Sequence, residues 1–109
     1  MRVLIVGGGL VGSTLAGKLS RDGHDVSLVD ASANRVRELS ESLDVRVVEG
    51  NGATGIVLRR AGIEEAGLVV ATSNSDEVNM IVGLLASALF KVPRIVVRLR
   101  DEDHAEAFS

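Results

Sequence analysis

A glycine-rich turn between an apolar run and an amphipathic segment constrains this chain most. Val3 to Val6 is continuously apolar, and the residues that follow are Gly7-Gly8-Gly9-Leu10-Val11-Gly12. Such a run is typical of a parallel strand buried on both faces, and residues 10–21 carry apolar side chains at helical spacing. A second run ends at Asp30. Strand, glycine turn, helix, strand and acid, in this order, are typical of a dinucleotide-binding fold.

Each position of the motif has its own physical role. Gly7 lets the chain turn sharply out of the strand, and Gly9 lets the backbone approach a pyrophosphate. Gly12 lets the helix pack closely on the sheet, and the free N–H groups at the helix start favour phosphates. Asp30 can accept hydrogen bonds from both ribose hydroxyls, which favours NAD over NADP. The alternative is a plain glycine turn with a helix-capping aspartate and no ligand.

Composition narrows the class of protein. The length of 109 residues predicts a single domain spanning 1–109, and 46% hydrophobic residues suffice for a core. The chain has no cysteine, and neither His24 nor His104 has a metal-ligand partner at useful spacing, so we assign both histidines to the surface and expect no metal and no catalytic residue. A net charge of −3 argues against nucleic-acid binding.

Apolar runs and amphipathic segments alternate along the whole chain. We expect strands near 2–6, 25–30, 45–49, 67–71 and 94–98, and helices near 10–21, 33–42, 54–61 and 75–90, with a further helix beginning at Asp101. This alternation predicts an α/β, three-layer, doubly wound Rossmann fold. Its parallel sheet would have the strand order 3-2-1-4-5 and lack a sixth strand.

Polar residues follow each predicted strand, where the ligands of such sheets bind. Asn51 can donate to and accept from an adenine edge, although Asn-Gly is also strong turn chemistry. Ser73 and Asn74 can contact phosphate or ribose, or cap the next helix. Arg98 ends the last strand, where it can reach a phosphate or lie in solvent. Arg100 is less well placed, and Arg35 lies a turn into the second helix.

The helix predicted over 75–90 is apolar on almost every side. A helix of this kind is buried on more than one face. We therefore expect its second face to meet another subunit, or residues beyond the C-terminus to cover it. Its uncharged run, from Val78 to Phe90, is too short to span a bilayer, which needs about 20 residues. Met1 starts directly in the first strand, so we expect no signal peptide, no direct membrane insertion and a cytoplasmic location.

These motifs together resemble the TrkA-type regulatory subunits of bacterial potassium-uptake systems and, more broadly, the RCK (KTN) domains that gate potassium channels and transporters. The resemblance covers nearly the whole chain. Its most specific parts are Ala-Gly-Ile-Glu-Glu-Ala at 61–66 and Ser-Asp-Glu-Val-Asn at 75–79. The other matching stretches are 6–16, 23–30, 47–52, 71–74 and 93–101.

The resemblance implies a nucleotide site and a partner. NAD(H), or ATP, ADP or AMP, would bind at Gly7, Gly8, Gly9, Leu10, Val11, Gly12, Asp30, Asn51, Ser73, Asn74 and Arg98. The protein would be cytosolic and held at the inner face of the membrane by an embedded potassium transporter subunit, and it would form homo-oligomers. Leu10 stands where many members carry Arg, Lys or Gln, which weakens a role as γ-phosphate sensor, and Asn51 stands where Asp is frequent.

Three functions fit these observations to different degrees. The first is a nucleotide-sensing regulatory domain of a potassium uptake system. The second is the cofactor domain of an NAD-dependent oxidoreductase, which would need a substrate domain and an acid–base residue beside the nicotinamide. The third is an interaction domain with a decayed site, against which the glycines and Asp30 argue. No His, Lys, Cys or Tyr lies in the crevice loops, so we expect no enzymatic activity.

Overall fold

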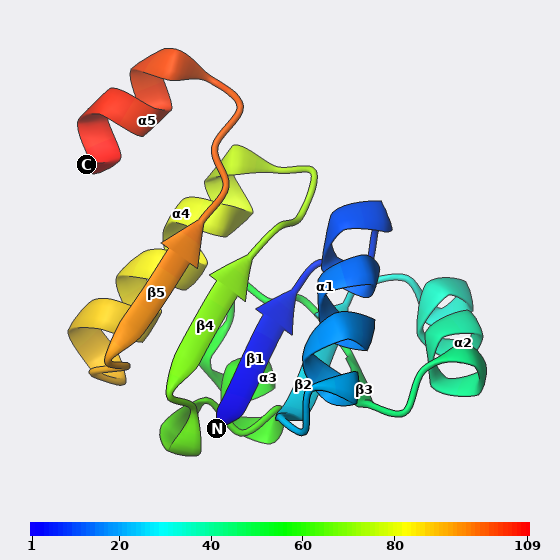
Figure 1. Cartoon of the computed structure of the whole chain (residues 1–109). Coiled ribbons are helices and arrows are strands. Elements are labelled where there is room, and N and C mark those ends of the chain that lie inside the picture. The colour runs from blue at the N-terminus through cyan, green and yellow to red at the C-terminus, as the bar shows by residue number, and fades with distance from the viewer.

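Strands and helices alternate along the whole chain in a computed structural model that describes residues 1–109 (Figure 1). The strands are β1 Arg2–Val6, β2 Asp25–Asp30, β3 Arg46–Glu49, β4 Leu68–Ala71 and β5 Arg94–Val97. The helices are α1 Leu10–Arg21, α2 Ala33–Ser42, α3 Gly55–Arg60, α4 Asp76–Leu84 and α5 Glu102–Phe108, with a 3₁₀ turn at Ile63–Glu65 and a π-helical turn at Leu85–Leu89. The predicted elements are confirmed, apart from the two short turns, which the periodicity did not reveal.

The five strands form one parallel sheet in the order β3-β2-β1-β4-β5. This confirms the predicted order and the absence of a sixth strand. The chain builds β1, β2 and β3 toward one edge and then returns to add β4 and β5 on the other side of β1. The topological switch point therefore lies between β1 and β4, because the connections that follow these two strands leave toward opposite faces of the sheet.

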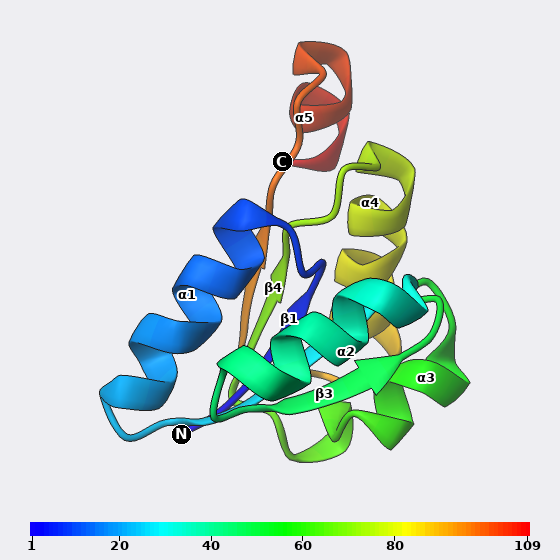
Figure 2. The same ribbon diagram turned by 90° about the vertical axis from the view of Figure 1, so that its right-hand side faces the viewer.

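Helices cover the two faces of the sheet and enclose two separate cores (Figure 2). On one face, Val3 and Ile5 of β1 pack with Ala16 of α1 and Leu39 of α2. On the other, alternate residues of the same strands pack with Leu58 of α3 and Val82 of α4. Strands buried on both sides explain why the sequence of β1 is continuously apolar rather than alternating. The three-layer architecture predicted from the sequence is confirmed.

The segment predicted as one helix over 75–90 changes its hydrogen-bonding pattern midway. The α-helix ends at Leu84, and the N–H of Phe90 donates to the carbonyl of Leu85, five residues earlier, at 3.0 Å. Val82 and Ala86 are fully buried against the sheet. On the other side of the segment, Leu84 remains 59% exposed, and Ile81 and Leu89 are also exposed. The expected second apolar face is thus present, and most of it is open.

Helix α5 leaves the sheet beyond the carboxyl end of β5 (Figure 1). Phe108 returns to α4, where its ring lies so close to Gly83 that a methyl group there would contact it at 2.7 Å. A hollow of about 650 Å³, lined mainly by hydrophobic residues of α4, β5 and α5, lies beside this contact. No helix of the structure has the length and continuous apolar character that crossing a membrane requires.

Candidate functional site

Two adjoining cavities open at the carboxyl ends of the strands, at the switch point between β1 and β4. One has a volume of about 310 Å³ and extends toward the connection after β3, whereas the other, of about 300 Å³, follows the glycine turn toward the end of β5. Gly7, Asp30, Ser73 and Asn74 line both cavities. Together they form one crevice in the place where open α/β sheets bind their ligands.

The glycine turn owes its shape to the absence of side chains. Gly7 has a φ of +109°, and a Cβ there would lie 2.6 Å from the backbone nitrogen of Ser73. A Cβ at Gly12 would overlap the carbonyl oxygen of Gly7. Gly12 thus holds α1 against the sheet from behind the turn and, unlike the other ten predicted site residues, lines neither cavity. A Cβ at Gly9 would meet no atom within 4 Å, so this position is open toward an incoming group.

Asp30 and Arg35 brace the glycine turn from two sides. The carboxylate of Asp30 accepts the N–H of Gly8 and the N–H of Ser32, both at 2.8 Å. The guanidinium of Arg35 donates from Nε to the carbonyl oxygen of Gly8 at 2.6 Å. Arg35 therefore reaches back to the turn, which its position one turn into α2 did not suggest. Asp30 also lines both cavities, where its carboxylate can still accept hydroxyl hydrogens.

Two loop predictions left a choice between ligand contact and local structure. The side-chain oxygen of Asn51 accepts the N–H of Ala53 at 2.9 Å, so the turn interpretation is confirmed. Asn51 nevertheless lines the first cavity, across from Asp30. In the other loop the hydroxyl of Ser75 accepts the N–H of Val78 at 3.2 Å and caps α4. Ser75 thus performs the capping, and Ser73 and Asn74 line both cavities.

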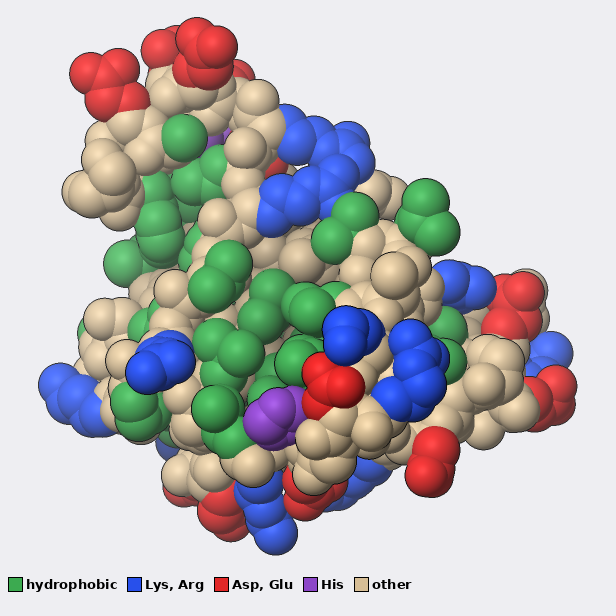
Figure 3. Space-filling view, in the orientation of Figure 1, with side chains coloured by type: hydrophobic (Ala, Val, Ile, Leu, Met, Phe, Trp, Pro, Cys, Tyr) green, Lys and Arg blue, Asp and Glu red, His purple; other side chains and the backbone are tan.

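Arg98 and Arg100 line the second cavity beside the glycine turn. Neither guanidinium forms an ion pair with a carboxylate, and Arg100 donates to the side-chain oxygen of Asn74 at 3.0 Å. Basic side chains, coloured blue, lie at this level of the surface, below and beside α5 (Figure 3). The sequence ranked Arg100 below Arg98, and the structure brings both to the same cavity. Two unpaired cations opposite helix N–H groups make this end of the crevice suited to an anion.

The remaining predicted positions lie at the mouth of the crevice. Leu10 is 82% exposed, and Val11 beside it is also exposed, both at the start of α1 and both lining the second cavity. The rim of the crevice therefore carries apolar side chains rather than charges at the start of α1.

The histidine assignment needs correction. His104 Nδ1 lies 3.0 Å from a carboxylate oxygen of Asp76, which is only 8% exposed, so His104 is not a plain surface side chain. Asp76 also accepts the backbone N–H groups of Arg100 and Asp101, each at 2.9 Å. These backbone hydrogen bonds, followed by the one from His104, lower the pKa of Asp76 from 3.8 to about 2. The hydrogen bond to Asp76 raises the pKa of His104 above 6.5. His24 is partly exposed, with its Nδ1 buried and unpartnered.

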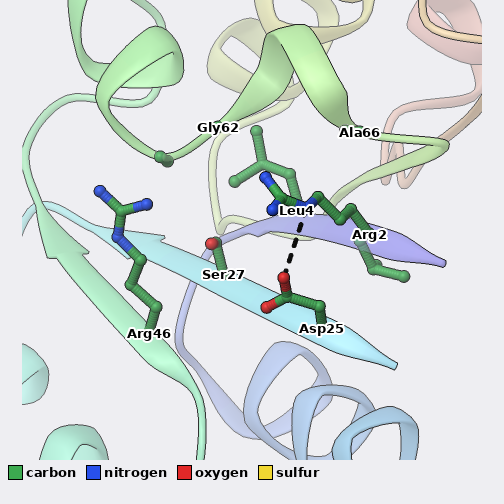
Figure 4. Close-up of a pocket in the computed structure, with 9 residues that line it drawn as sticks. Arg2, Leu4, Asp25, Ser27, Arg46, Gly62 and Ala66 are labelled. Atoms are coloured by element: carbon green, nitrogen blue, oxygen red, sulfur yellow. Dashed lines mark ion pairs between the residues drawn. The ribbon is translucent and has the colours of Figure 1, made fainter. Parts of the chain in front are cut away.

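Another cavity lies at the opposite end of the sheet (Figure 4). It has a volume of about 220 Å³ and is lined by the residues that begin β1, β2 and β3, which are Arg2, Asp25 and Arg46. Arg2 pairs with Asp25 at 3.4 Å, and Arg46 donates to the carbonyl of Arg60 at 2.7 Å. These charges already have partners, and the 3₁₀ turn that starts after Gly62 beside this cavity carries the acidic Glu64 and Glu65. The crevice at the switch point is the better candidate.

Comparison with known proteins gives consistent matches over the whole chain. A family model for the TrkA-N domain matches residues 3–109. The chain is 46% identical over 100 residues to the Trk system potassium uptake protein TrkA of Halomonas elongata, covering 92% of this chain and 22% of that protein. It is 39% identical over 109 residues to a TrkA homolog of Methanothermobacter thermautotrophicus, covering 100% of this chain and 50% of that protein. The chain thus spans between about a fifth and a half of these relatives.

Solved structures agree with the fold and resemble the chain in sequence. The TrkA-N domain of the inner membrane protein ybaL from Escherichia coli superposes with a TM-score of 0.88 at 29% identity, covering 98% of this chain and 78% of that one. The AMP-bound Kef C-terminal domain of Shewanella denitrificans superposes with a TM-score of 0.85 at 26% identity, covering 99% of this chain and 65% of that one. The GsuK channel bound to NAD superposes with a TM-score of 0.82 at 26% identity, covering 98% of this chain and 19% of that one.

Proposed function

Because this chain belongs to the TrkA-N domain family, we propose that it is a nucleotide-binding regulatory domain of a membrane potassium uptake system. One observation carries the proposal. The glycine turn, Asp30, the Ser73–Asn74 loop and the Arg98–Arg100 strand end converge on a single crevice at the switch point. A ribose acceptor there matches the sugar of a nucleotide, and open backbone N–H groups together with unpaired cations match its phosphates.

The ligand we propose is NAD(H) or an adenine nucleotide. Asp30 would accept the ribose hydroxyls, Gly7 to Val11 and Arg98 would hold the phosphates, and Asn51 would lie near the adenine. The open direction at Gly9 supports this placement, because it is where a pyrophosphate would approach the backbone. Of two similar structures, one is bound to AMP and the other to NAD, which is consistent with either ligand.

We place the protein in the cytoplasm, bound at the inner face of the membrane by a potassium transporter subunit. The relatives named as Trk potassium uptake proteins support this location. In this role the domain performs no chemistry on its ligand. Nucleotide binding would shift the equilibrium between arrangements of the subunits, and it can do so only by as much as its affinity differs between them.

We also propose that the domain forms a homo-oligomer through the open side of α4 and the turn that follows. Ile81, Leu84 and Leu89 are each more than 40% exposed, although Val82 and Ala86 of the same segment are buried in the core. Exposed apolar side chains aligned on one segment are typical of a subunit contact. A second copy would bury this stripe and thereby link the nucleotide crevice, which lies at the start of α4, to the subunit boundary.

Calorimetric titration with NAD, NADH, ATP, ADP and AMP, combined with light scattering, tests the proposal. A regulatory domain should bind some of these ligands more tightly than others and change its mass or shape when it does. Binding of none of the five would contradict the proposal. Steady oxidation of NADH with a small carbonyl substrate would instead favour the cofactor domain of an oxidoreductase.

A further inference from the structure

Asn79 of α4 joins two segments that line the crevice, and every hydrogen-bonding group of its side chain has a partner. Its side chain is 0% exposed. The oxygen accepts the N–H of Ser73 at 3.0 Å and the hydroxyl of Ser73 at 2.7 Å. The amide nitrogen donates to the carbonyl of Ser73 at 3.1 Å and to that of Arg98 at 2.8 Å. One buried side chain therefore fixes the loop after β4 and the end of β5 at a set separation.

Asp76, one turn earlier on α4, extends this attachment to the next residues of the chain. Its two carboxylate oxygens accept the N–H groups of Arg100 and Asp101, at 2.9 Å each. Asp101 in turn caps α5 by accepting the N–H groups of Asp103 and His104. The segment from Arg98 to Asp101 thus rests on two side chains of α4 and leads directly into α5.

The side chains that face the crevice project from these anchored backbones. Arg98 and Arg100 line the cavity beside the glycine turn, and Arg100 also donates to Asn74 in the loop after β4. We propose that Asp76 and Asn79 are positioning residues of the nucleotide site, which hold the arginine pair at phosphate distance and transmit occupancy of the crevice to α5. The inference rests on the proposed nucleotide binding and adds residues and a direction of coupling to it.

The alternative is that the two residues only hold the fold together. The two roles differ in what they do to ligands with and without a phosphate. If the residues position the arginines, substituting them weakens the binding of AMP, whose phosphate would meet the arginines. The binding of adenosine, which would rely on Asp30 and the adenine side, stays unchanged. If the residues only hold the fold together, substituting them weakens the binding of both ligands, because the whole crevice loosens.

The test variant is Asp76→Asn, and Glu77→Gln is its matched control. Asp76→Asn keeps one acceptor oxygen but turns an amide NH₂ toward the second backbone N–H, so one of the two anchors is lost. Glu77→Gln removes the same charge from the adjacent position, where the side chain only accepts from Ser75 at 3.2 Å. A second variant, Asn79→Asp, keeps the acceptor for Ser73 and loses both donated hydrogen bonds. Circular dichroism and thermal melting verify that each variant folds.

Calorimetry with AMP and adenosine, together with amide NMR spectra of α5, gives the answer. We expect Asp76→Asn to weaken AMP binding about tenfold, the effect of about 1.4 kcal/mol, and to leave adenosine unchanged. AMP should shift the amide signals of residues 102–108 in the wild type and in Glu77→Gln, and much less in Asp76→Asn. Equal losses for AMP and adenosine, or no loss for either, would overturn the inference while the wild type still binds. A wild type that binds neither ligand would overturn the proposed function as well.

Discussion

Two alanine substitutions within the glycine turn should separate folding from ligand binding. At Gly12 a Cβ would overlap the carbonyl oxygen of Gly7 and lie 2.9 Å from the hydroxyl of Thr72, so backbone must move. At Gly9, three residues earlier, a Cβ would meet nothing within 4 Å. The two substitutions are chemically identical, and only the surroundings of the added methyl group differ.

The magnitudes follow from these surroundings. Overpacking against backbone costs up to about 3 kcal/mol, and the better helix propensity of alanine returns about 1 kcal/mol. Gly12→Ala should therefore destabilise the domain by about 2 kcal/mol and lower Tm by about 8–16 °C. At Gly9, φ is −71°, which alanine tolerates, and the weaker helix cap and the stiffer unfolded chain nearly cancel. Gly9→Ala should keep the wild-type Tm.

Thermal melting and calorimetry with AMP or NAD measure the two effects side by side. Gly9→Ala should fold like the wild type and bind at least about tenfold more weakly, because the methyl group takes the space of the phosphates. Gly12→Ala should instead show the lowered Tm. Unchanged binding by Gly9→Ala would refute the placement of the phosphates on this turn, and an unchanged Tm for Gly12→Ala would refute the close packing of α1.

Three further predictions concern charge and assembly. Asp30→Ala should weaken AMP and NAD binding by about 1–3 kcal/mol, the range for unmade hydrogen bonds to a charged group, and calorimetry would show an unchanged affinity if Asp30 lies outside the site. The raised pKa of His104 means that its contact with Asp76 stabilises the fold fully below pH 6.5 and loses effect as the pH rises through the higher folded pKa. Wild type should therefore melt above His104→Gln in acid, and the two curves should converge in alkali; a gap independent of pH would contradict this account. Leu84→Glu should convert an oligomer to monomers in light scattering without lowering Tm by much, since Leu84 is 59% exposed, and a persistent oligomer would place the subunit contact elsewhere.

The sequence predicted what depends on local spacing. Apolar runs gave the strands, helical periodicity gave α1 and α2, and the glycine turn fixed where the first strand ends. The sheet order followed because short crossovers between parallel strands admit few arrangements. Asp30 could be assigned to the crevice once the sheet order was known, because it ends β2, the strand next to β1.

Contacts between distant parts of the chain were beyond such reasoning. Arg35 reaches Gly8 across 27 positions, and Arg100 reaches Asn74 across 26. The direction of a long side chain depends on what surrounds it, which helix periodicity does not reveal. His104 was taken as a surface residue for the same reason, because its partner Asp76 is 28 positions away. The attachment of the loop after β4 and of the segment after β5 to α4 became visible only with the fold.

The central claim is that a nucleotide binds at the carboxyl ends of β1 and β4. Amide chemical shifts recorded during a titration with AMP or NAD test it most directly. We expect the largest changes at Gly7 to Val11, Asp30, Ser73, Asn74 and Arg98. Changes concentrated instead at the opposite end of the sheet, around Arg2 and Arg46, or no changes at all, would contradict it.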